Sequence, residues 1–385
     1  MAEGGAVPSG EWARLEAAIK NGLRQLRSRY LPSAGGWGDP KNGVGDSVEL
    51  GESPLCALPV DMQLYIISFL SPQHLCMLGM TSHYWYLLVQ DRLLWRYFLI
   101  RDLPSWPSVE WHGLPDKAVL SSLFSESAED SAPPPNYMSI YLKCCPRSRK
   151  ALRSRHPVYG AVTSFFQSLV MPGEPRFAMF GPGIEQMDDS LVARMMTSPD
   201  LVPVMCILQK QIDGIGSGVT FQLDNQHKFN ILTLYTRTSS ERDRARRDQG
   251  TSANKIFMNV DPNGNQPGVS LSYALMPKVK EVCKVVDGFI YVANAESNRE
   301  HNREDEVAQI LAMADPEFGP QKRPFLVLSC VTRPGDKCIP SVFMAHDLNL
   351  NKLNRPWMVQ NTEISTLSGL LDGIDWILGE VGRKL

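Results

Sequence analysis

Residues 58–98 hold the densest run of large apolar side chains in the sequence, and this run constrains the fold more than any other feature. Pro59 suits the first turn of a helix, Ser71-Pro72 restarts a second helix, and a third follows around Trp85. Three short helices enclose little interior, so they cannot bury all of these side chains among themselves. The pattern therefore predicts a helical unit that presents part of its apolar surface to a partner protein.

The spacing within this run resembles the F-box family. The matching positions are Leu58-Pro59, Ile66, Ser68-Phe69-Leu70, Leu75, Trp85, Leu88 and Leu94-Trp95. The resemblance implies that this segment binds the Skp-type adaptor, and through it the cullin, of an SCF ubiquitin ligase. The adaptor-binding residues that it implies are Leu58, Pro59, Ile66, Leu70, Leu75, Trp85, Leu94 and Trp95. The alternative is a helical subdomain that packs only against the rest of the chain.

The C-terminal part of the sequence alternates between short and longer apolar segments. The short runs predict strands at 177–180, 219–223, 229–235, 288–293, 325–330 and 342–345. The longer segments predict helices at 185–196, 241–258, 272–286, 301–314 and 362–381, the last with Thr362 as N-cap. Strands with continuous apolar runs that alternate with helices indicate a mostly parallel sheet covered on both faces.

A strand, a glycine-rich turn and a helix at 176–192 resemble a phosphate-binding loop that has lost its function. Aligning the motif on Gly183 places Asp188 at the second glycine, Asp189 at the lysine and Ser190 at the hydroxyl position. A carboxylate in place of the lysine would repel the phosphates. The elements that follow strands 229–235 and 325–328 in a GTPase are also missing, and Gly214–Gly218 favours a turn into strand 219–223. The layout resembles a small-GTPase-like domain without nucleotide.

These observations predict an α+β multi-domain protein with four segments. Residues 1–54 form an N-terminal amphipathic helix (11–30) and a flexible linker, and 55–101 form the F-box. Residues 102–158 form a helical linker, and 159–385 an α/β GTPase-like substrate-binding domain. The N-terminal helix either docks on its own domain or mediates association with a partner, so a homodimer stays open.

An F-box joined to a GTPase-like domain without nucleotide motifs resembles F-box proteins that act as substrate receptors. The resemblance implies a non-catalytic subunit whose substrates, including a telomeric-repeat-binding factor and a D-type cyclin, are ubiquitinated and degraded. It also implies N-terminal phosphorylation, for which Ser9 is the candidate, although Gly10 follows it instead of proline. The expected location is the cytoplasm, with the nucleus as a second one. The alternatives are a divergent P-loop nucleoside triphosphatase and an F-box scaffold that acts outside the ligase.

The segment 339–346 is interpreted as a late strand introduced by Pro340, because proline is tolerated at strand starts and sheet edges. An edge strand can pair with a strand of a partner. We therefore expect substrate binding along Ser341, Phe343 and Ala345, unless the chain's own loop protects this edge.

Composition excludes several other classes of protein. Lys and Arg number 39 and Asp and Glu 41, so the net charge of -2 offers no field that would hold DNA or RNA. No apolar run approaches the ~18 residues of a membrane span. The eight cysteines include no Cys-x-x-Cys pair, which favours free thiols and predicts no metal or other cofactor. The seven histidines are scattered and give no catalytic constellation.

Overall fold

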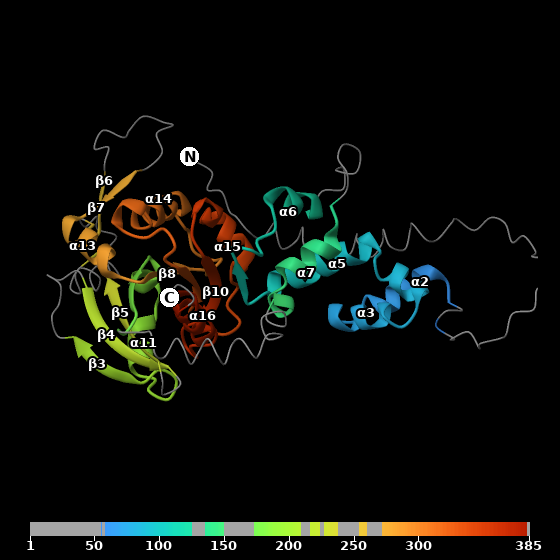
Figure 1. Ribbon diagram of the computed structural model, residues 1–385, viewed down its shortest axis with the longest axis horizontal. Helices are drawn as coiled ribbons and strands as arrows, with labels where there is room; N and C mark the ends of the chain where they lie inside the picture. The colour runs from blue at the N-terminus through green and yellow to red at the C-terminus, as the bar shows by residue number, and fades with distance from the viewer. Residues whose placement is uncertain are drawn as a thin grey trace, which may run out of the picture. The chain divides into compact units, whose positions relative to one another are not determined.

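The computed structural model describes residues 55, 58–124, 135–149, 173–208, 216–223, 227–237, 254–259 and 272–382 of the chain. The chain divides into two compact units (Figure 1). The helical unit combines residues up to Ser105 with Pro115–Cys145, and the sheet unit combines Trp106–Leu114 with Pro146–Leu385. The chain therefore passes from one unit to the other three times.

Six helices make up the described part of the helical unit. They are α2 (Val60–Ile67), α3 (Pro72–Gly79), α4 (His83–Leu88), α5 (Arg92–Asp102), α6 (Lys117–Phe124) and α7 (Tyr137–Cys144). A short 3-10 turn, η1 (Leu103–Ser105), follows α5. Helix α5 packs along α7, where the ring of Trp95 meets those of Phe98 and Tyr141 edge to face.

Polar side chains cap the N-termini of helices α3, α4 and α5. The hydroxyl of Ser71 accepts from the backbone N–H of His74, and that of Ser82 from the N–H of Trp85, both at 3.3 Å. The carboxylate of Asp91 accepts from the first N–H groups of α5, at 2.8 and 3.0 Å. Such caps satisfy N–H groups that have no partner inside the helix. They explain why three short helices form in so few residues.

Eight strands form the large sheet in the described part of the sheet unit. They are β1 (Ser108–Glu110), β2 (Arg176–Phe180), β3 (Val204–Leu208), β4 (Gly216–Leu223), β5 (His227–Leu234), β8 (Gly288–Asn294), β9 (Phe325–Val331) and β10 (Trp357–Glu363). Their order across the sheet is β1-β10-β9-β8-β2-β5-β4-β3. The central run from β10 to β5 is parallel, and β1, β4 and β3 are antiparallel to their neighbours. The expected α+β architecture with a mostly parallel sheet is confirmed.

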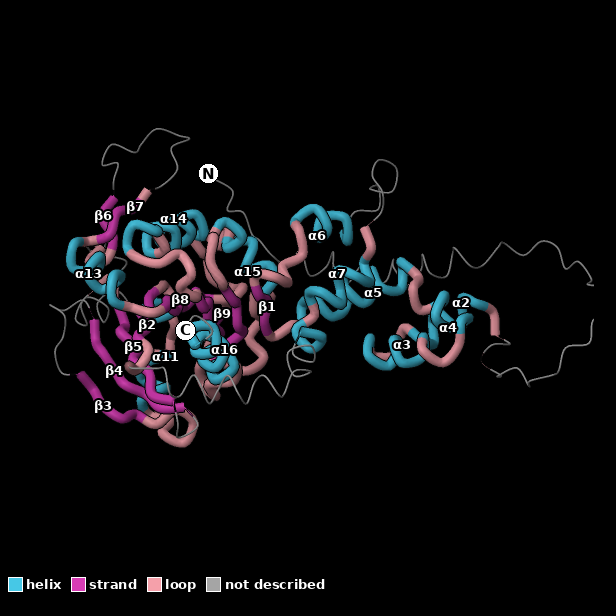
Figure 2. The backbone as a smooth tube through the Cα atoms, in the orientation of Figure 1, coloured by secondary structure: helices cyan, strands magenta, loops and turns pink. Residues whose placement is uncertain are grey.

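Helices and a small hairpin surround this sheet (Figure 2). The helices are α10 (Gly183–Gln186), α11 (Leu191–Met196), α13 (Pro277–Val285), α14 (Arg303–Met313), α15 (Ser341–Asp347) and α16 (Leu370–Gly382). Two 3-10 turns are η2 (Pro316–Phe318) and η3 (Leu350–Lys352), and the hairpin pairs β6 (Phe257–Asn259) with β7 (Tyr273–Leu275).

Both faces of the central strands are buried. On one face, Ile290 and Val292 of β8 belong to a cluster that includes side chains of α11 and α16. On the other face, the ring of Tyr291 meets those of Phe180 and Phe325. Because successive residues of a strand point to opposite faces, burial of the whole of β8 requires cover on both sides.

The segment expected to be an edge strand at 341–346 is helix α15 instead, so this prediction is wrong. Ser341 and Ala345 are completely buried, and Phe343 is half-buried. The hydroxyl of Ser341 donates to the carbonyl oxygen of Trp106 at 3.1 Å, and α15 packs against β1 and β10. A short apolar run does not distinguish a buried strand from a buried helix by periodicity. The structure therefore gives no support to substrate contacts along an edge strand at these residues.

Several other boundaries differ from the sequence predictions. Thr362 lies within β10, and the helix that it was expected to cap begins at Leu370. Gly216 and Gly218 are part of β4 and not of a turn. Residues 272–286 divide into β7 and α13, 185–196 into α10 and α11, and 102–158 contain β1. The helix predicted at 301–314 is confirmed as α14. The N-terminal helix 11–30, Ser9 and residues 241–253 lie outside the described residues.

Candidate functional site

The helices α2 to α4 expose a group of large apolar side chains, which we call the F-box surface. Its members are Leu58, Val60, Met62, Tyr65, Ile66, Phe69, Met77, Met80, Tyr84, Tyr86 and Leu87. Phe69 is 69% exposed and Met80 is 86% exposed, although both have side chains that water disfavours. An exposed apolar group of this size marks an interaction site.

The eight adaptor-binding residues expected from sequence separate into two sets. Leu58, Pro59 and Ile66 belong to the exposed set, and Leu70 is half-buried. Leu75, Trp85, Leu94 and Trp95 lie in the core of the helical unit, where three of the four have no exposed surface. These four side chains hold the helices together, so the structure does not support direct contact with an adaptor.

Polar contacts behind the F-box surface hold its helices in position. The amide of Gln63 donates to the carbonyl oxygen of Leu58 at 2.7 Å, and the hydroxyl of Tyr84 donates to Gln63 from α4. The guanidinium of Arg101 donates to the carbonyl oxygen of Ser68 at 3.0 Å. Arg101 also forms a two-pronged ion pair with Asp102, to which the hydroxyl of Tyr141 donates at 2.7 Å. Burial, reinforced by Asp102, raises the pKa of Tyr141, so this hydroxyl stays a donor.

The degenerate phosphate loop lies between β2 and α11 in the sheet unit. Gly181 follows β2 with a φ of 126°, which favours glycine, and its position against the backbone of Val292 leaves no room for a side chain. The next helix, α10, has only 4 residues, and α11 starts separately after Ser190. A phosphate loop needs a continuous helix whose N-terminus faces the phosphates. This segment lacks such a helix.

The structure does not bring the four residues of the degenerate loop into one site. Gly183 is buried against β8, and Asp188 forms an ion pair with Arg299 at 3.0 Å. Asp189 and Ser190 line a different, smaller groove, and Ser190 caps α11. The sequence alignment identified the loop, but it could not show that the helix after it is broken.

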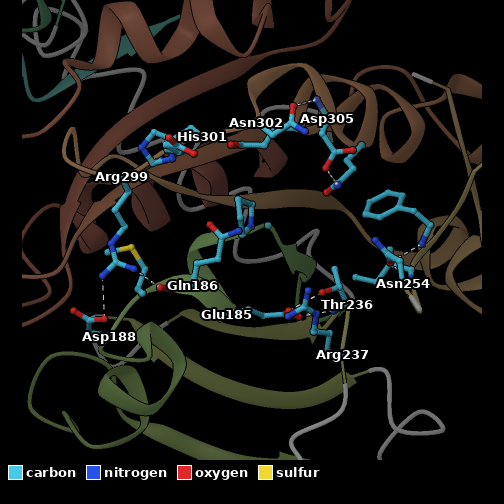
Figure 3. Close-up of a pocket in the computed structure, with 18 residues that line it drawn as sticks. Glu185, Gln186, Asp188, Thr236, Arg237, Asn254, Arg299, His301, Asn302 and Asp305 are labelled. Carbon is cyan, nitrogen blue, oxygen red and sulfur yellow. Dashed lines mark hydrogen bonds and ion pairs between the residues drawn. The ribbon is translucent and has the colours of Figure 1, made fainter. Parts of the chain in front are cut away.

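A cavity of about 730 Å³ lies beside this loop, and Figure 3 shows its walls. The segment after β2 contributes Glu185 of α10 and Asp188, and the chain after β5 contributes Thr236 and Arg237. The remaining walls come from the segments 254–257 and 299–309. Sequence analysis missed this cavity because its walls come from four separate segments of the chain without a shared motif.

An ion-pair network borders the cavity. Arg299 pairs with Asp188 and, at 2.6 Å, with the buried Glu296, whose carboxylate also accepts from the backbone N–H of Thr332 at 3.2 Å. The hydrogen bond to Asp188 raises the pKa of Arg299. Burial lowers the pKa of His301, whose Nε2 lies 2.8 Å from the carbonyl oxygen of Glu296. At neutral pH this ring is therefore uncharged and donates from Nε2.

The described residues contain neither a membrane-spanning helix nor a cluster of metal-ligating side chains. Among them no helix has the length and apolar character needed to cross a bilayer. In the same residues His, Cys, Asp and Glu side chains form no cluster that could hold a metal ion. The described cysteines are free thiols: Cys76, Cys144, Cys145, Cys206, Cys283, Cys330 and Cys338. Burial raises the pKa of Cys283 to about 12, so this thiol stays protonated.

Comparison with known proteins identifies the family to which the chain belongs. Residues 55–101 match the F-box-like family model. The chain is 50% identical over 377 residues to F-box only protein 4 of Bos taurus and of Homo sapiens, covering 98% of this chain and 95% of each relative. It is also 50% identical over 386 residues to F-box only protein 4 of Mus musculus, covering 99% of this chain and 97% of the relative.

Proposed function

Since the chain belongs to the F-box only protein 4 family, we propose that it is the substrate-recognition subunit of an SCF-type ubiquitin ligase. In this role the helical unit binds the Skp-type adaptor, and the sheet unit binds protein substrates. The chain then does no chemistry itself. It raises the local concentration of a substrate beside a ubiquitin-charged enzyme, and proximity of this kind accelerates a reaction.

The observation that supports adaptor binding most strongly is the F-box surface. Tyr65 of α2 and Phe69, two residues after this helix, lie with their rings edge to face, 5.0 Å apart, and both are exposed. Burial of such side chains on a partner yields about 25 cal/mol for each Å² of apolar surface removed from water. The buried core of the helical unit, which includes Leu94 and Trp95, packs its helices together.

Strand β3, at the end of the sheet opposite β1, supports the proposal that the sheet unit binds substrates. Among the described strands, β3 pairs only with β4. Met205 and Ile207 of β3 are about half exposed, so this edge offers both backbone groups and apolar side chains to a partner strand. The substrates that we propose, from the family resemblance, are a telomeric-repeat-binding factor and a D-type cyclin, met in the cytoplasm and the nucleus.

The test of adaptor binding is the substitution Phe69→Asp. A charge at this exposed position should weaken binding of the purified adaptor by about 30-fold or more, the loss typical of a central interface residue. Isothermal titration calorimetry measures the dissociation constant. Val285→Asp, an exposed apolar position in the sheet unit, serves as the matched control and should leave the constant unchanged.

A core substitution separates contact from folding in the same assay. Leu94→Ala should also reduce adaptor binding, but together with a lower melting temperature, because it leaves a cavity that costs about 2–5 kcal/mol. Phe69→Asp should leave the melting temperature close to that of the native chain. Equal adaptor affinity of Phe69→Asp and the native chain would contradict the proposed interface.

Two other functions make different predictions. A divergent nucleoside triphosphatase would bind labelled GTP or ATP tightly in the presence of magnesium, whereas Asp188 and the 4-residue helix α10 favour no binding. A scaffold that acts outside the ligase would co-purify with the adaptor but without the cullin. Affinity purification of the full chain distinguishes this alternative from the ligase subunit.

A further inference from the structure

The cavity in the sheet unit lies where open α/β sheets bind ligands. Its walls follow the carboxyl ends of β2, β5 and β8, which are neighbours in the order β8-β2-β5. The chain leaves β2 to form β5 on one side and then returns to form β8 on the other side. Ligands of such sheets bind outside the carboxyl ends of the strands at this point of reversal.

The walls of this cavity have a negative formal charge. Five carboxylates line it, from Glu185, Asp188, Glu300, Asp305 and Glu306, against the two guanidinium groups of Arg237 and Arg299. The formal charge of the walls is therefore -3, with His301 neutral at neutral pH. A field of this sign repels phosphates and carboxylates and attracts cations.

Some of this charge is already compensated. Arg299 pairs with Asp188, and Arg303, which stands behind the wall, pairs with Glu306 at 2.8 Å. The carboxylate of Glu306 also accepts from the hydroxyl of Tyr291, so it is fully used within the fold.

Two carboxylates on different walls meet only uncharged donors. Glu185 accepts from the backbone N–H and the hydroxyl of Thr236, at 2.5 and 2.6 Å. Asp305 accepts from the hydroxyl of Tyr273 and, at 2.8 Å, from the amide of Gln309. Figure 3 shows Glu185 on the lower wall and Asp305 on the upper wall, with the cavity between them. These bonds hold both carboxylates in place, and neither carboxylate forms an ion pair with another described residue.

We propose that this cavity binds the guanidinium group of an arginine side chain of a polypeptide. A guanidinium has five N–H donors in one plane and no acceptor, and carboxylates are its preferred partners. The amide oxygen of Gln186, which lines the same cavity, adds a neutral acceptor. The inference goes beyond the proposed function and does not depend on the F-box, because it stands on the charges of this cavity alone.

Two sources can supply this guanidinium group. One is a separate polypeptide, such as a protein presented to the sheet unit. The other is this chain, whose sequence between the cavity residues Arg237 and Asn254 contains Arg242, Arg244, Arg246 and Arg247. Both sources deliver a guanidinium to the same carboxylates, so one experiment with two arms distinguishes them.

The experiment measures binding of a fluorescein-labelled peptide with two arginines to the full-length protein by fluorescence anisotropy. The comparison peptide has citrulline in place of arginine, which keeps the shape and removes the charge. We expect saturable binding of the arginine peptide and at least about fivefold weaker binding of the citrulline peptide, as for the loss of a charge-assisted bond. Equal binding of the two peptides would overturn the proposal.

Isosteric variants locate the site. Asp305→Asn and Glu185→Gln keep the shape of the side chain, replace one carboxylate oxygen by an NH2 group and remove one charge each, and each should weaken binding of the arginine peptide by at least about fivefold. Glu317→Gln, an exposed carboxylate on η2 outside the cavity, is the matched control. Glu300→Gln removes an exposed cavity charge, so it reports on the site even if a substitution at the half-buried Glu185 or Asp305 disturbs folding. An equal effect of Glu317→Gln and Asp305→Asn would refute the assignment.

A second arm identifies the source of the arginine. A variant with all four arginines of 242–247 changed to glutamine should bind the arginine peptide more tightly if the chain supplies the group itself, because a competitor is then removed. Unchanged affinity assigns the site to a separate polypeptide. Weaker binding in this variant would contradict the proposal, because it would place the peptide on the segment and not in the cavity.

Discussion

Two tyrosines of the sheet unit donate their hydroxyls to neighbouring carboxylates of α14. Tyr273 donates to Asp305, and Tyr291 donates to Glu306 at 2.8 Å. Burial, together with the bond to Asp305, raises the pKa of Tyr273 from 10.0 to about 12, and burial also raises the pKa of Tyr291. Both hydroxyls therefore stay protonated at neutral pH, and the bond from Tyr273 ties the hairpin β6–β7 to α14.

This bond predicts a loss of stability in alkali. Since the folded pKa of Tyr273 lies above its ordinary value, its contribution is fully present below pH 10.0 and is lost as the pH rises through about 12. Tyr273→Phe should lower the free energy of unfolding by about 1 kcal/mol at pH 8 and flatten its decline between pH 10 and pH 12. Urea unfolding at several pH values measures both effects.

The matched control is Tyr86→Phe, which removes an exposed hydroxyl of the helical unit. It should leave the alkaline decline unchanged. A native-like decline in Tyr273→Phe would show that the bond to Asp305 is not the cause.

The F-box shows how far residue-level prediction from sequence can go. The spacing of apolar residues located the F-box segment correctly, because short helices place their apolar residues at regular steps along the sequence. It did not separate Ile66, which is exposed, from Trp95, which is buried. The segment is apolar on most sides of its helices, so periodicity does not indicate which side faces inward. Only packing against α7 decides that Trp95 is core.

At the scale of elements, α16 depends on glycine in two opposite ways. Gly369, just before the helix, has a φ of 81°, and an added Cβ would lie 2.1 Å from the carbonyl oxygen of Asn361. Gly379, within the helix, has open space around the position of a Cβ. One glycine is therefore required by the turn from β10 to α16, and the other only lowers helix propensity.

We expect alanine substitutions of the two glycines to change the free energy of unfolding in opposite directions. Gly379→Ala should raise the free energy of unfolding by about 0.5–1 kcal/mol, the difference in helix propensity. Gly369→Ala should lower it by more than that amount, because the left-handed backbone and the clash with Asn361 both oppose a side chain. Paired denaturation curves measure the difference, and a gain in stability from Gly369→Ala would refute this account of the turn.

Elements were predictable where the side chains on both faces are apolar. Strands β8 and β9 have continuous apolar runs and were recognised. Strand β10 was missed because Gln360, Asn361 and Thr362 interrupt its apolar character, although two of these side chains are buried. Helix α15 was mistaken for a strand because 341–346 is short, apolar and preceded by proline. The cavity could not be predicted, since it depends on how four segments that are separate in the sequence meet in the fold.

At the scale of the whole molecule, the sheet unit is not one continuous segment. Its edge strand β1 comes from 106–114, between two stretches of the helical unit. The backbone N–H of Asn361 donates to the carbonyl oxygen of Pro107 at 2.8 Å, and that of Trp111 donates to Trp357 at 3.0 Å. The domain boundary that the sequence predicts at residue 159 therefore excludes β1, although this strand belongs to the sheet.

This arrangement predicts the behaviour of a fragment. Residues 146–385 alone lack β1 and expose the edge of β10, which unpaired strands of other molecules can join. The fragment should melt at a lower temperature than the sheet unit of the full chain and should self-associate in size-exclusion chromatography. A synthetic peptide of residues 106–114 should raise the melting temperature and reduce association. A monomeric fragment that does not respond to the peptide would contradict this reading.

The pairing of β1 with β10 also sets an order of events during synthesis. Glu110 pairs with Met358, so roughly 250 residues separate the two strands along the chain. At about 5–20 residues per second, the ribosome needs roughly 12–50 seconds to add this length. Throughout that interval β1 has been synthesised but its partner does not yet exist. A nascent chain must therefore keep this short strand, which is buried in the folded protein, from other contacts until Trp357–Glu363 has been made.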